Sequence, residues 1–330
     1  MKRFLIKTLF FVTPFILIVI SFALTDPFRI IKSYRNYFDN FIVEPNRDFV
    51  STEVYLRNRA KYKYNSFIFG SSRTLAYRTK SWKKHLDSTA VPFVFDASGE
   101  SIFGIYTKIN YIDKVGDSLK NCLIILCNNC SFIYEADHKG HLFMKHPTVA
   151  GTSWSNFYFE SLKAYLDFDF LRNYRHYLFA NIFNSSEHSC GNRMNVEYDT
   201  ITNDYRLAGV ENEIQNNFQL YYRKHKKLFY ERKSFVKQSK QEISDKQKSM
   251  LIEIKKIFDK HRTKYRIVIS PLYTQIKFNE NDLKLLRSIF GIYVYDFSGK
   301  NEFTNNIYNY FENSHYKPVV GDSIMNMIYK

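Results

Sequence analysis

Two short segments carry side chains that could act together as a nucleophile and its base. In residues 67–74 (Phe-Ile-Phe-Gly-Ser-Ser-Arg-Thr), an apolar run meets a Gly-Ser-Ser turn that contains Ser72. Near the C-terminus, Glu312 and His315 stand three residues apart, so the carboxylate could orient the imidazole and stabilise its cation. Each motif is common alone, because serine often caps helices. Together they are far more specific and indicate a serine activated by a histidine.

Other residues that could carry chemistry are sparse. Cys127 and Cys130 form a C-x-x-C pattern after an apolar run, which leaves a redox function open as an alternative. A second pair that would complete a zinc site is missing, because His188 and Cys190 lie far off in sequence. The sequence therefore predicts neither a metal nor another cofactor.

Strand-like and helical patterns alternate along most of the chain. Such alternation is typical of a parallel, doubly wound sheet with helices on both faces. The run at 122–126 is apolar throughout, as expected for a strand buried on both sides. We therefore predict an α/β fold, a three-layer sandwich around a mainly parallel five-stranded sheet. The expected strands are 64–69, 91–95, 122–126, 265–270 and 292–295, and the expected helices are 75–86, 102–119, 248–261, 282–290 and a last one through 324 and 328.

The first 25 residues predict the compartment. A basic start precedes an uncharged, apolar run from Thr8 to Thr25, which is nearly long enough to cross a hydrocarbon core. We expect a single-pass anchor in the bacterial cytoplasmic membrane, with the N-terminus inside and the catalytic domain outside. A cleaved signal peptide is the alternative, because small residues surround a cleavage point at 21–23. Under either interpretation, the chain from residue 26 onward is exported.

The remainder divides into a connector and one domain. Residues 26–60 are predicted as a juxtamembrane connector, and residues 61–330 as the catalytic domain. The strand–helix alternation is lost between about 131 and 240, a segment rich in aromatic residues with helical patches such as 156–177. We interpret it as a partly helical insertion over the carboxyl edge of the sheet, where ligands bind in open α/β proteins. It could be a lid, an acceptor surface or a structural insert.

The charge favours a polyanionic partner. The formal net charge is +16, and 18% of the residues are aromatic. No zinc-finger, helix-turn-helix or RNP-like pattern accompanies the positive charge, so nucleic acid is not a predicted partner. Anionic lipid or acidic polysaccharide suits an exported protein better, although a solvated basic face explains the charge equally well.

A Gly-x-Ser turn after the first strand and a carboxylate-x-x-His before the last helix resemble the SGNH (GDSL-like) hydrolase superfamily. The chain is more similar to the membrane-anchored branch that works in cell-envelope acylation, such as DltD and the alginate acetylation proteins. The resemblance runs from about Phe67 to Ile328 and omits the insertion. It implies that Ser72 is the nucleophile, His315 its base, and Glu312 the orienting carboxylate in place of the family's usual aspartate.

The resemblance also implies an oxyanion hole. Gly99 matches the glycine of the family's second block, and Asn128 matches the asparagine of its third, with Asn129 as the alternative register. The backbone N–H groups of Ser72 and Gly99, with the Asn128 amide, would then hold the oxyanion.

The implied reaction passes through an acyl-Ser72 that water or a sugar hydroxyl resolves. We expect acetyl transfer to an envelope or exported polysaccharide, and the resemblance implies a polytopic membrane-bound O-acyltransferase as the acyl donor. A simple carbohydrate or lipid esterase is one alternative. A non-catalytic assembly or glycan-binding protein that retains the fold is another.

Overall fold

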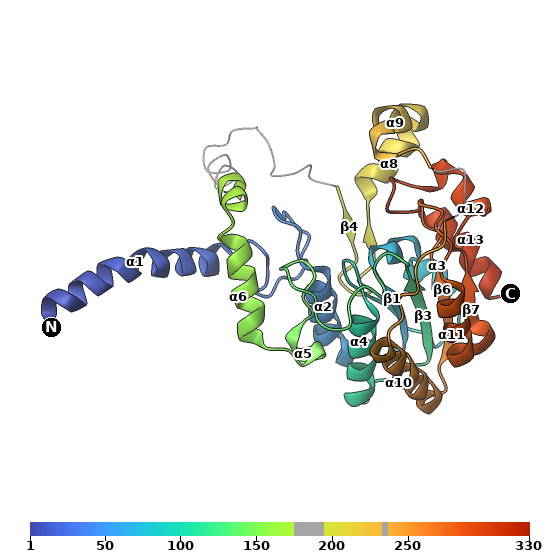
Figure 1. Ribbon diagram of the computed structural model, residues 1–330, viewed down its shortest axis with the longest axis horizontal. Helices are drawn as coiled ribbons and strands as arrows, with labels where there is room; N and C mark the ends of the chain where they lie inside the picture. The colour runs from blue at the N-terminus through green and yellow to red at the C-terminus, as the bar shows by residue number, and fades with distance from the viewer. Residues whose placement is uncertain (175–194, 233–236) are drawn as a thin grey trace.

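A five-stranded parallel sheet lies at the centre of the protein (Figure 1). A computed structural model describes residues 1–174, 195–232 and 237–330. The strand order is β2-β1-β3-β6-β7, and every neighbouring pair is parallel. The predicted α/β class and mainly parallel sheet are therefore confirmed. The strands are β1 (Ser66–Gly70), β2 (Pro92–Asp96), β3 (Asn121–Leu126), β6 (Lys264–Ile269) and β7 (Val294–Asp296).

Alternate residues of each strand enter two separate hydrophobic cores. In β1, Phe67 and Phe69 belong to one core, whereas Ile68 belongs to the other. Because successive strand residues point to opposite faces, a strand that is apolar throughout needs a helical layer on each side. The first core is completed by α2 (Arg47–Tyr62), α4 (Ile102–Lys114), α10 (Asp245–His261) and α11 (Glu280–Phe290), and the second by α3 (Thr79–Lys83) and α13 (Pro318–Ile328).

Helix α2 lies within the segment predicted as a connector. It packs against β2, so the second half of residues 26–60 belongs to the sheet's helical layer. Its buried face includes Phe49 and Val54, but also the polar Ser51 and Thr52. These buried polar residues obscure the 3.6-residue hydrophobic period that would have revealed the helix.

The helix predicted at 75–86 is wrong, because two short elements stand there. Ser72 begins a 3-10 helix, η1 (Ser72–Ala76), and α3 follows after a break at Tyr77 and Arg78. The cause is a tertiary contact. The carboxylate of Asp204 accepts hydrogen bonds from the backbone N–H and the hydroxyl of Thr79, and so caps α3 as a separate helix.

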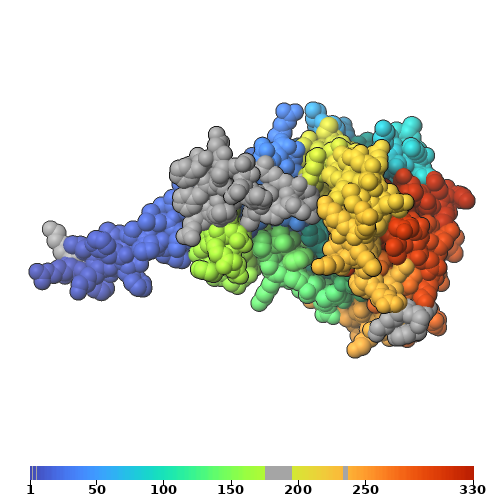
Figure 2. Space-filling model, turned by 90° about the horizontal axis from the view of Figure 1, so that it is seen from above, coloured from blue at the N-terminus to red at the C-terminus, as the bar shows by residue number. Residues whose placement is uncertain are grey.

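The N-terminal helix α1 (Lys2–Thr25) extends from the domain as a separate arm (Figures 1 and 2). Its stretch from Ile6 to Thr25 is long and apolar enough to span a membrane or to act as a signal sequence. Helix α6 (Trp154–Tyr165) crosses its C-terminal end, where the hydroxyls of Ser21 and Tyr165 lie 2.9 Å apart. The arm is therefore joined to the domain by side-chain contacts as well as by the chain.

The segment predicted as an insertion contains short helices and a two-stranded hairpin. The hairpin turn covers the edge strand β2, because Val94 N–H donates to Thr202 O at 2.9 Å. The predicted helical patch at 156–177 is α6 in its first part, and its end, like Cys190, lies outside the described residues. The other described elements of this segment are α5 (Pro147–Ala150), β4 (Glu197–Tyr198), β5 (Tyr205–Arg206), α8 (Ala208–Asn216), α9 (Phe218–Lys224) and η2 (Lys226–Leu228). Outside it, η3 (Gly291–Tyr293), α12 (Glu302–Asn305) and η4 (Ile307–Asn309) lie near the last strand and before α13.

Helix α13 packs directly on the backbone that carries Ser72. A Cβ atom on Gly321 would lie 2.0 Å from the carbonyl oxygen of Ala76, at the end of η1. Only glycine permits this approach, because any side chain would overlap the backbone. His315 lies three residues before α13 begins. The contact therefore sets the spacing between the His315 segment and the Ser72 turn.

Replacing Gly321 by alanine is expected to lower the free energy of unfolding by about 1–3 kcal/mol, because the new methyl group overpacks the contact with Ala76. Chemical unfolding followed by circular dichroism measures the change. Val319→Ala is the matched control on the same helix, since Val319 is 59% exposed, and we expect a change within about 0.5 kcal/mol. Equal stability of Gly321→Ala and the parent would contradict the close packing.

Candidate active site

Ser72 and His315, 243 residues apart in sequence, meet at the carboxyl edge of the sheet. His315 Nε2 lies 2.8 Å from Ser72 Oγ, and His315 Nδ1 is hydrogen-bonded to a carboxylate oxygen of Glu312. An ionised carboxylate can only accept, so Nδ1 carries the proton and Nε2 is left to accept the proton of Ser72. The structure thus brings together the three residues predicted as nucleophile, base and orienting carboxylate.

Glu312 is held in its ionised form. Burial alone would raise the pKa of this carboxyl, but the hydrogen bond and charge of His315, the N–H of Ser314 and the charge of Arg73 outweigh it and lower the pKa. The Ser314 N–H donates to the second carboxylate oxygen at 2.6 Å. The longer side chain of glutamate therefore still reaches the imidazole, and its charge can stabilise an imidazolium.

The loop that carries His315 is fixed from two sides. Tyr310 and Tyr316 form a β-bridge across it, and Phe311 N–H donates to His315 O at 2.9 Å. Two tyrosines of α9 bind the same loop. Tyr221 donates to Phe311 O and Tyr222 to Tyr310 O, each at 2.7 Å. Helix α9, within the predicted insertion, thus positions the base.

Gly99 lines the same cavity as Ser72. Its φ angle is +57°, in the left-handed region that favours glycine. The next residue, Glu100, is fully buried and accepts a hydrogen bond from Ser101 N–H at 3.0 Å. The turn predicted to supply an oxyanion donor therefore borders the cavity that Ser72 also lines.

Asn128 is not brought to this cavity. It is buried, and its side-chain amide donates to Ile276 O at 3.5 Å. Asn129, the alternative register, is exposed. Neither belongs to the described residues that line the cavity around Ser72. The chain turns at Cys127–Cys130 directly after β3, and this turn directs Asn128 toward the segment after β6.

The cavity has a volume of about 590 Å³ and lies between the sheet edge and the segment from β5 to η2. Arg47 on its wall pairs with Asp96 at 2.7 Å, and Arg47 Nη1 has no acceptor among the described residues. Among the described residues, the lining consists of Glu44, Arg47, Ser72, Leu75, Asp96, Ser98, Gly99, Phe143, Tyr205, Leu207, Val210, Glu213, Tyr221, His225, Leu228, Phe311, Glu312 and His315.

A buried polar cluster that the sequence did not reveal flanks Ser72. Arg73 Nη1 lies 3.5 Å from Ser71 Oγ and 3.8 Å from Cys130 Sγ, and Ser71 Oγ lies 3.5 Å from Cys127 Sγ. Burial would raise the pKa of Cys127, but the Cys130 thiol and the Arg73 charge lower it to about 5. Both cysteines are buried, which disfavours exchange with an external thiol. The cluster positions the residues on each side of the nucleophile.

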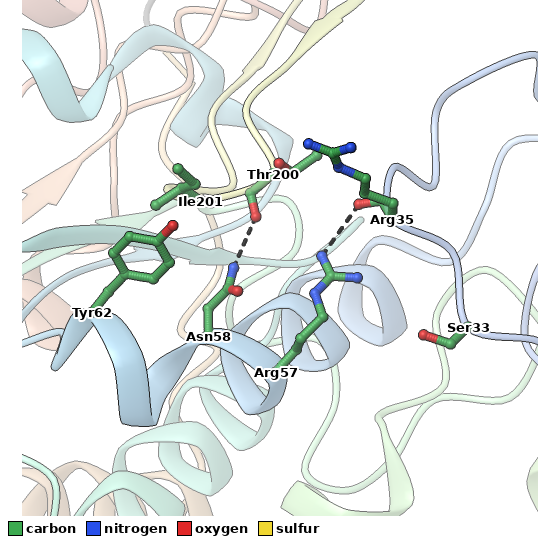
Figure 3. Close-up of a pocket in the computed structure, with 7 residues that line it drawn as sticks. All are labelled: Ser33, Arg35, Arg57, Asn58, Tyr62, Thr200 and Ile201. Atoms are coloured by element: carbon green, nitrogen blue, oxygen red, sulfur yellow. Dashed lines mark hydrogen bonds between the residues drawn. The ribbon is translucent and has the colours of Figure 1, made fainter.

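A second pocket of about 440 Å³ lies near the C-terminal end of α2 (Figure 3). Arg57 there donates to Arg35 O at 3.3 Å, and Asn58 to Thr200 O at 2.8 Å. The described residues that line it include no histidine or carboxylate that could act as a base. Among the described ranges, no three metal-ligating side chains cluster into a metal site. The cavity at Ser72 is thus the candidate active site.

Comparison with known proteins adds no evidence of function, so the function must be inferred from the geometry of the site. No protein-family model matches the chain, and no curated protein matches it.

Four buried charges support the Gly99 turn. Lys108 Nζ lies 2.8 Å from Asp48 and 2.5 Å from Glu100, and Lys145 Nζ lies 2.7 Å from Glu100. All four side chains are at most 4% exposed. Burial would raise the pKa of Asp48, but the two lysines lower it below the ordinary 3.8. The cluster ties the start of α2 to the turn after β2.

Lys108→Met is expected to reduce the free energy of unfolding at neutral pH by about 3–5 kcal/mol, because two buried carboxylates would share one lysine. The depressed pKa of Asp48 adds stability above about pH 4, which is lost as the pH falls through its folded value. The difference between parent and variant should therefore shrink below about pH 4. Urea unfolding across this pH range measures it. Lys114→Met, exposed on the same helix, is the control, and a constant difference at all pH values would contradict the assignment.

Proposed function

We propose that this chain is a serine-dependent acyl-transfer enzyme of the SGNH type, with an acyl-Ser72 intermediate. One observation carries the proposal: the hydrogen-bonded series Ser72–His315–Glu312 opens on a cavity large enough for a substrate. A serine whose hydroxyl contacts an oriented imidazole is the arrangement that nucleophilic acyl chemistry requires.

The reaction has two steps. His315 Nε2 accepts the Ser72 proton while Ser72 Oγ attacks the ester carbonyl, and Glu312 stabilises the imidazolium. Backbone N–H groups of Ser72 and Gly99 would stabilise the oxyanion. The leaving alcohol departs with the proton from His315, and an acyl-Ser72 remains. An acceptor hydroxyl then gives its proton to His315 and takes the acyl group, and His315 returns the proton to Ser72 Oγ as the serine ester breaks.

The acceptor that we propose is a hydroxyl group of an envelope or exported polysaccharide. Two features support it: the N-terminal helix, which would hold the domain beside a membrane, and the net charge of +16, which would attract an acidic glycan. The acyl donor in this proposal is a polytopic membrane-bound O-acyltransferase. Hydrolysis follows from the same intermediate when water replaces the sugar hydroxyl.

A fluorophosphonate probe is expected to add once to the full-length chain, and intact mass spectrometry detects the adduct. Ser72→Ala should abolish it. His315→Ala should slow its formation by about 10²–10⁴-fold, because the general base is lost. Ser98→Ala is the matched control, since Ser98 lines the same cavity, and it should react like the parent. An adduct that survives Ser72→Ala, or no adduct from folded protein, would refute the assignment of the nucleophile.

Glu312→Gln tests the orienting carboxylate. A glutamine amide can donate to Nδ1 and favour the wrong tautomer of His315, so we expect the probe reaction to slow by up to about 10⁴-fold. Glu302→Gln, an exposed carboxylate on α12, serves as the control and should leave the rate unchanged. Stopped-flow kinetics with a chromogenic ester provides an independent measurement. An unchanged rate in Glu312→Gln would show that Ser72 and His315 act as a dyad.

A further inference from the structure

The cavity that holds Ser72 is walled mainly by hydrocarbon. Leu75 comes from η1, three positions after the nucleophile, and Val210 and Leu228 come from α8 and η2. Leu228 is 41% exposed, although it lines a cavity. Leu75 and Val210 are half-buried, so the three side chains together give this cavity an aliphatic wall that an apolar part of a ligand could cover. The remaining apolar lining is Phe143, Leu207, Tyr205, Tyr221 and Phe311.

The size of the cavity exceeds what an acetyl group needs. At about 590 Å³ it falls within the range of sites that enclose drug-sized ligands. A two-carbon acyl group on Ser72 would contact only the nearest wall. Most of the aliphatic surface would then stay in contact with water, at a cost proportional to its area.

Several charged groups of the lining are already paired with one another or with their neighbours. Arg47 pairs with Asp96, and Glu213 pairs with Lys224 at 3.1 Å. Arg47 Nη1 and Ser98 could bind a hydroxyl group elsewhere in the cavity. Sugar hydroxyls placed against Leu75, Val210 and Leu228 would be buried without partners, which is unfavourable. An alkyl chain carries no such groups. The apolar part of an ester with a polar alcohol is its acyl chain, so the wall fits the acyl side of the substrate.

We propose that this wall binds the alkyl chain of the acyl donor, so that Ser72 carries an acyl group several carbons longer than acetyl. The inference rests on the proposed function, and it names an acyl class other than the acetyl group that the family resemblance implies. The step is balanced: the ester bond of the donor breaks, the Ser72 ester forms, and the donor alcohol leaves with the serine proton through His315.

The test is the chain-length profile of the full-length protein with p-nitrophenyl acetate, butyrate, hexanoate and octanoate, each kept below its micellar concentration. Ser72→Ala supplies the blank rate. We expect kcat/KM to rise by up to about fourfold for each added methylene group that the wall buries, so that octanoate exceeds acetate by at least about tenfold. Leu228→Asn should lower the octanoate-to-acetate ratio at least fivefold. Leu220→Asn, a leucine of similar exposure (44%) that lies on α9 and does not line the cavity, should leave the ratio unchanged.

The two proposals fail in different ways. Turnover that depends on Ser72 but is as fast with acetate as with octanoate would overturn the acyl-chain inference and leave the proposed function standing. An octanoate preference that Leu228→Asn and Leu220→Asn reduce equally would also overturn it, because the wall would then not be the cause. Absence of both turnover and a probe adduct in folded protein would overturn both proposals.

Discussion

The backbone contact between Gly321 and Ala76 sets the geometry on which the site depends. A parallel sheet brings the ends of β1 and β2 to one edge, and so places Ser72 near Gly99. It does not by itself place a residue near the C-terminus. Helix α13 lies against η1 with no side chain between them, and His315 precedes that helix by three residues. Ser72 and His315 are therefore held by elements that pack directly on each other.

Two kinds of buried polar group hold the site in place: charged side chains and tyrosine hydroxyls. The lysines at 108 and 145 fix Glu100 and with it the turn at Gly99, whereas the hydroxyls of Tyr221 and Tyr222 fix the loop before His315. Such groups are expensive to bury unless each has a partner, so they specify a single arrangement when all are satisfied. The side chains of Ser72, Glu312 and His315 stay partly exposed and line the cavity.

The sequence predicts those elements whose hydrophobic pattern follows from burial in the central sheet. All five strands appear within a few residues of their predicted positions. The reason is clearest for β1, β2 and β3, which are buried at every position and therefore form nearly continuous apolar runs. Helix α2 could not be predicted from its hydrophobic pattern, because the polar Ser51 and Thr52 share its buried face. The break between η1 and α3 depends on Asp204, more than a hundred residues away, and no local pattern records such a contact.

The candidate site was predictable only in part, for a similar reason. Ser72, Glu312 and His315 stand in short motifs, which can be recognised from the sequence alone. The burial of Asn128 depends on how the turn after β3 is directed, and the role of Arg73 depends on cysteines that meet it only in the fold. The C-x-x-C pattern left a redox function open as an alternative, whereas the contacts of Cys127 with Ser71 and of Cys130 with Arg73 indicate a positioning role. For Asn128 and for the C-x-x-C pattern, the role depends on contacts that form only in the folded protein.

The central claim is that Ser72 carries the acyl group during turnover. The most direct test is an acid quench of the full-length protein within milliseconds of mixing with p-nitrophenyl octanoate, followed by peptide mapping with tandem mass spectrometry. We expect an octanoyl group on the peptide that contains Ser72, attached to that serine. Octanoyl found only on a lysine or a cysteine, or turnover without any acylated peptide, would contradict it.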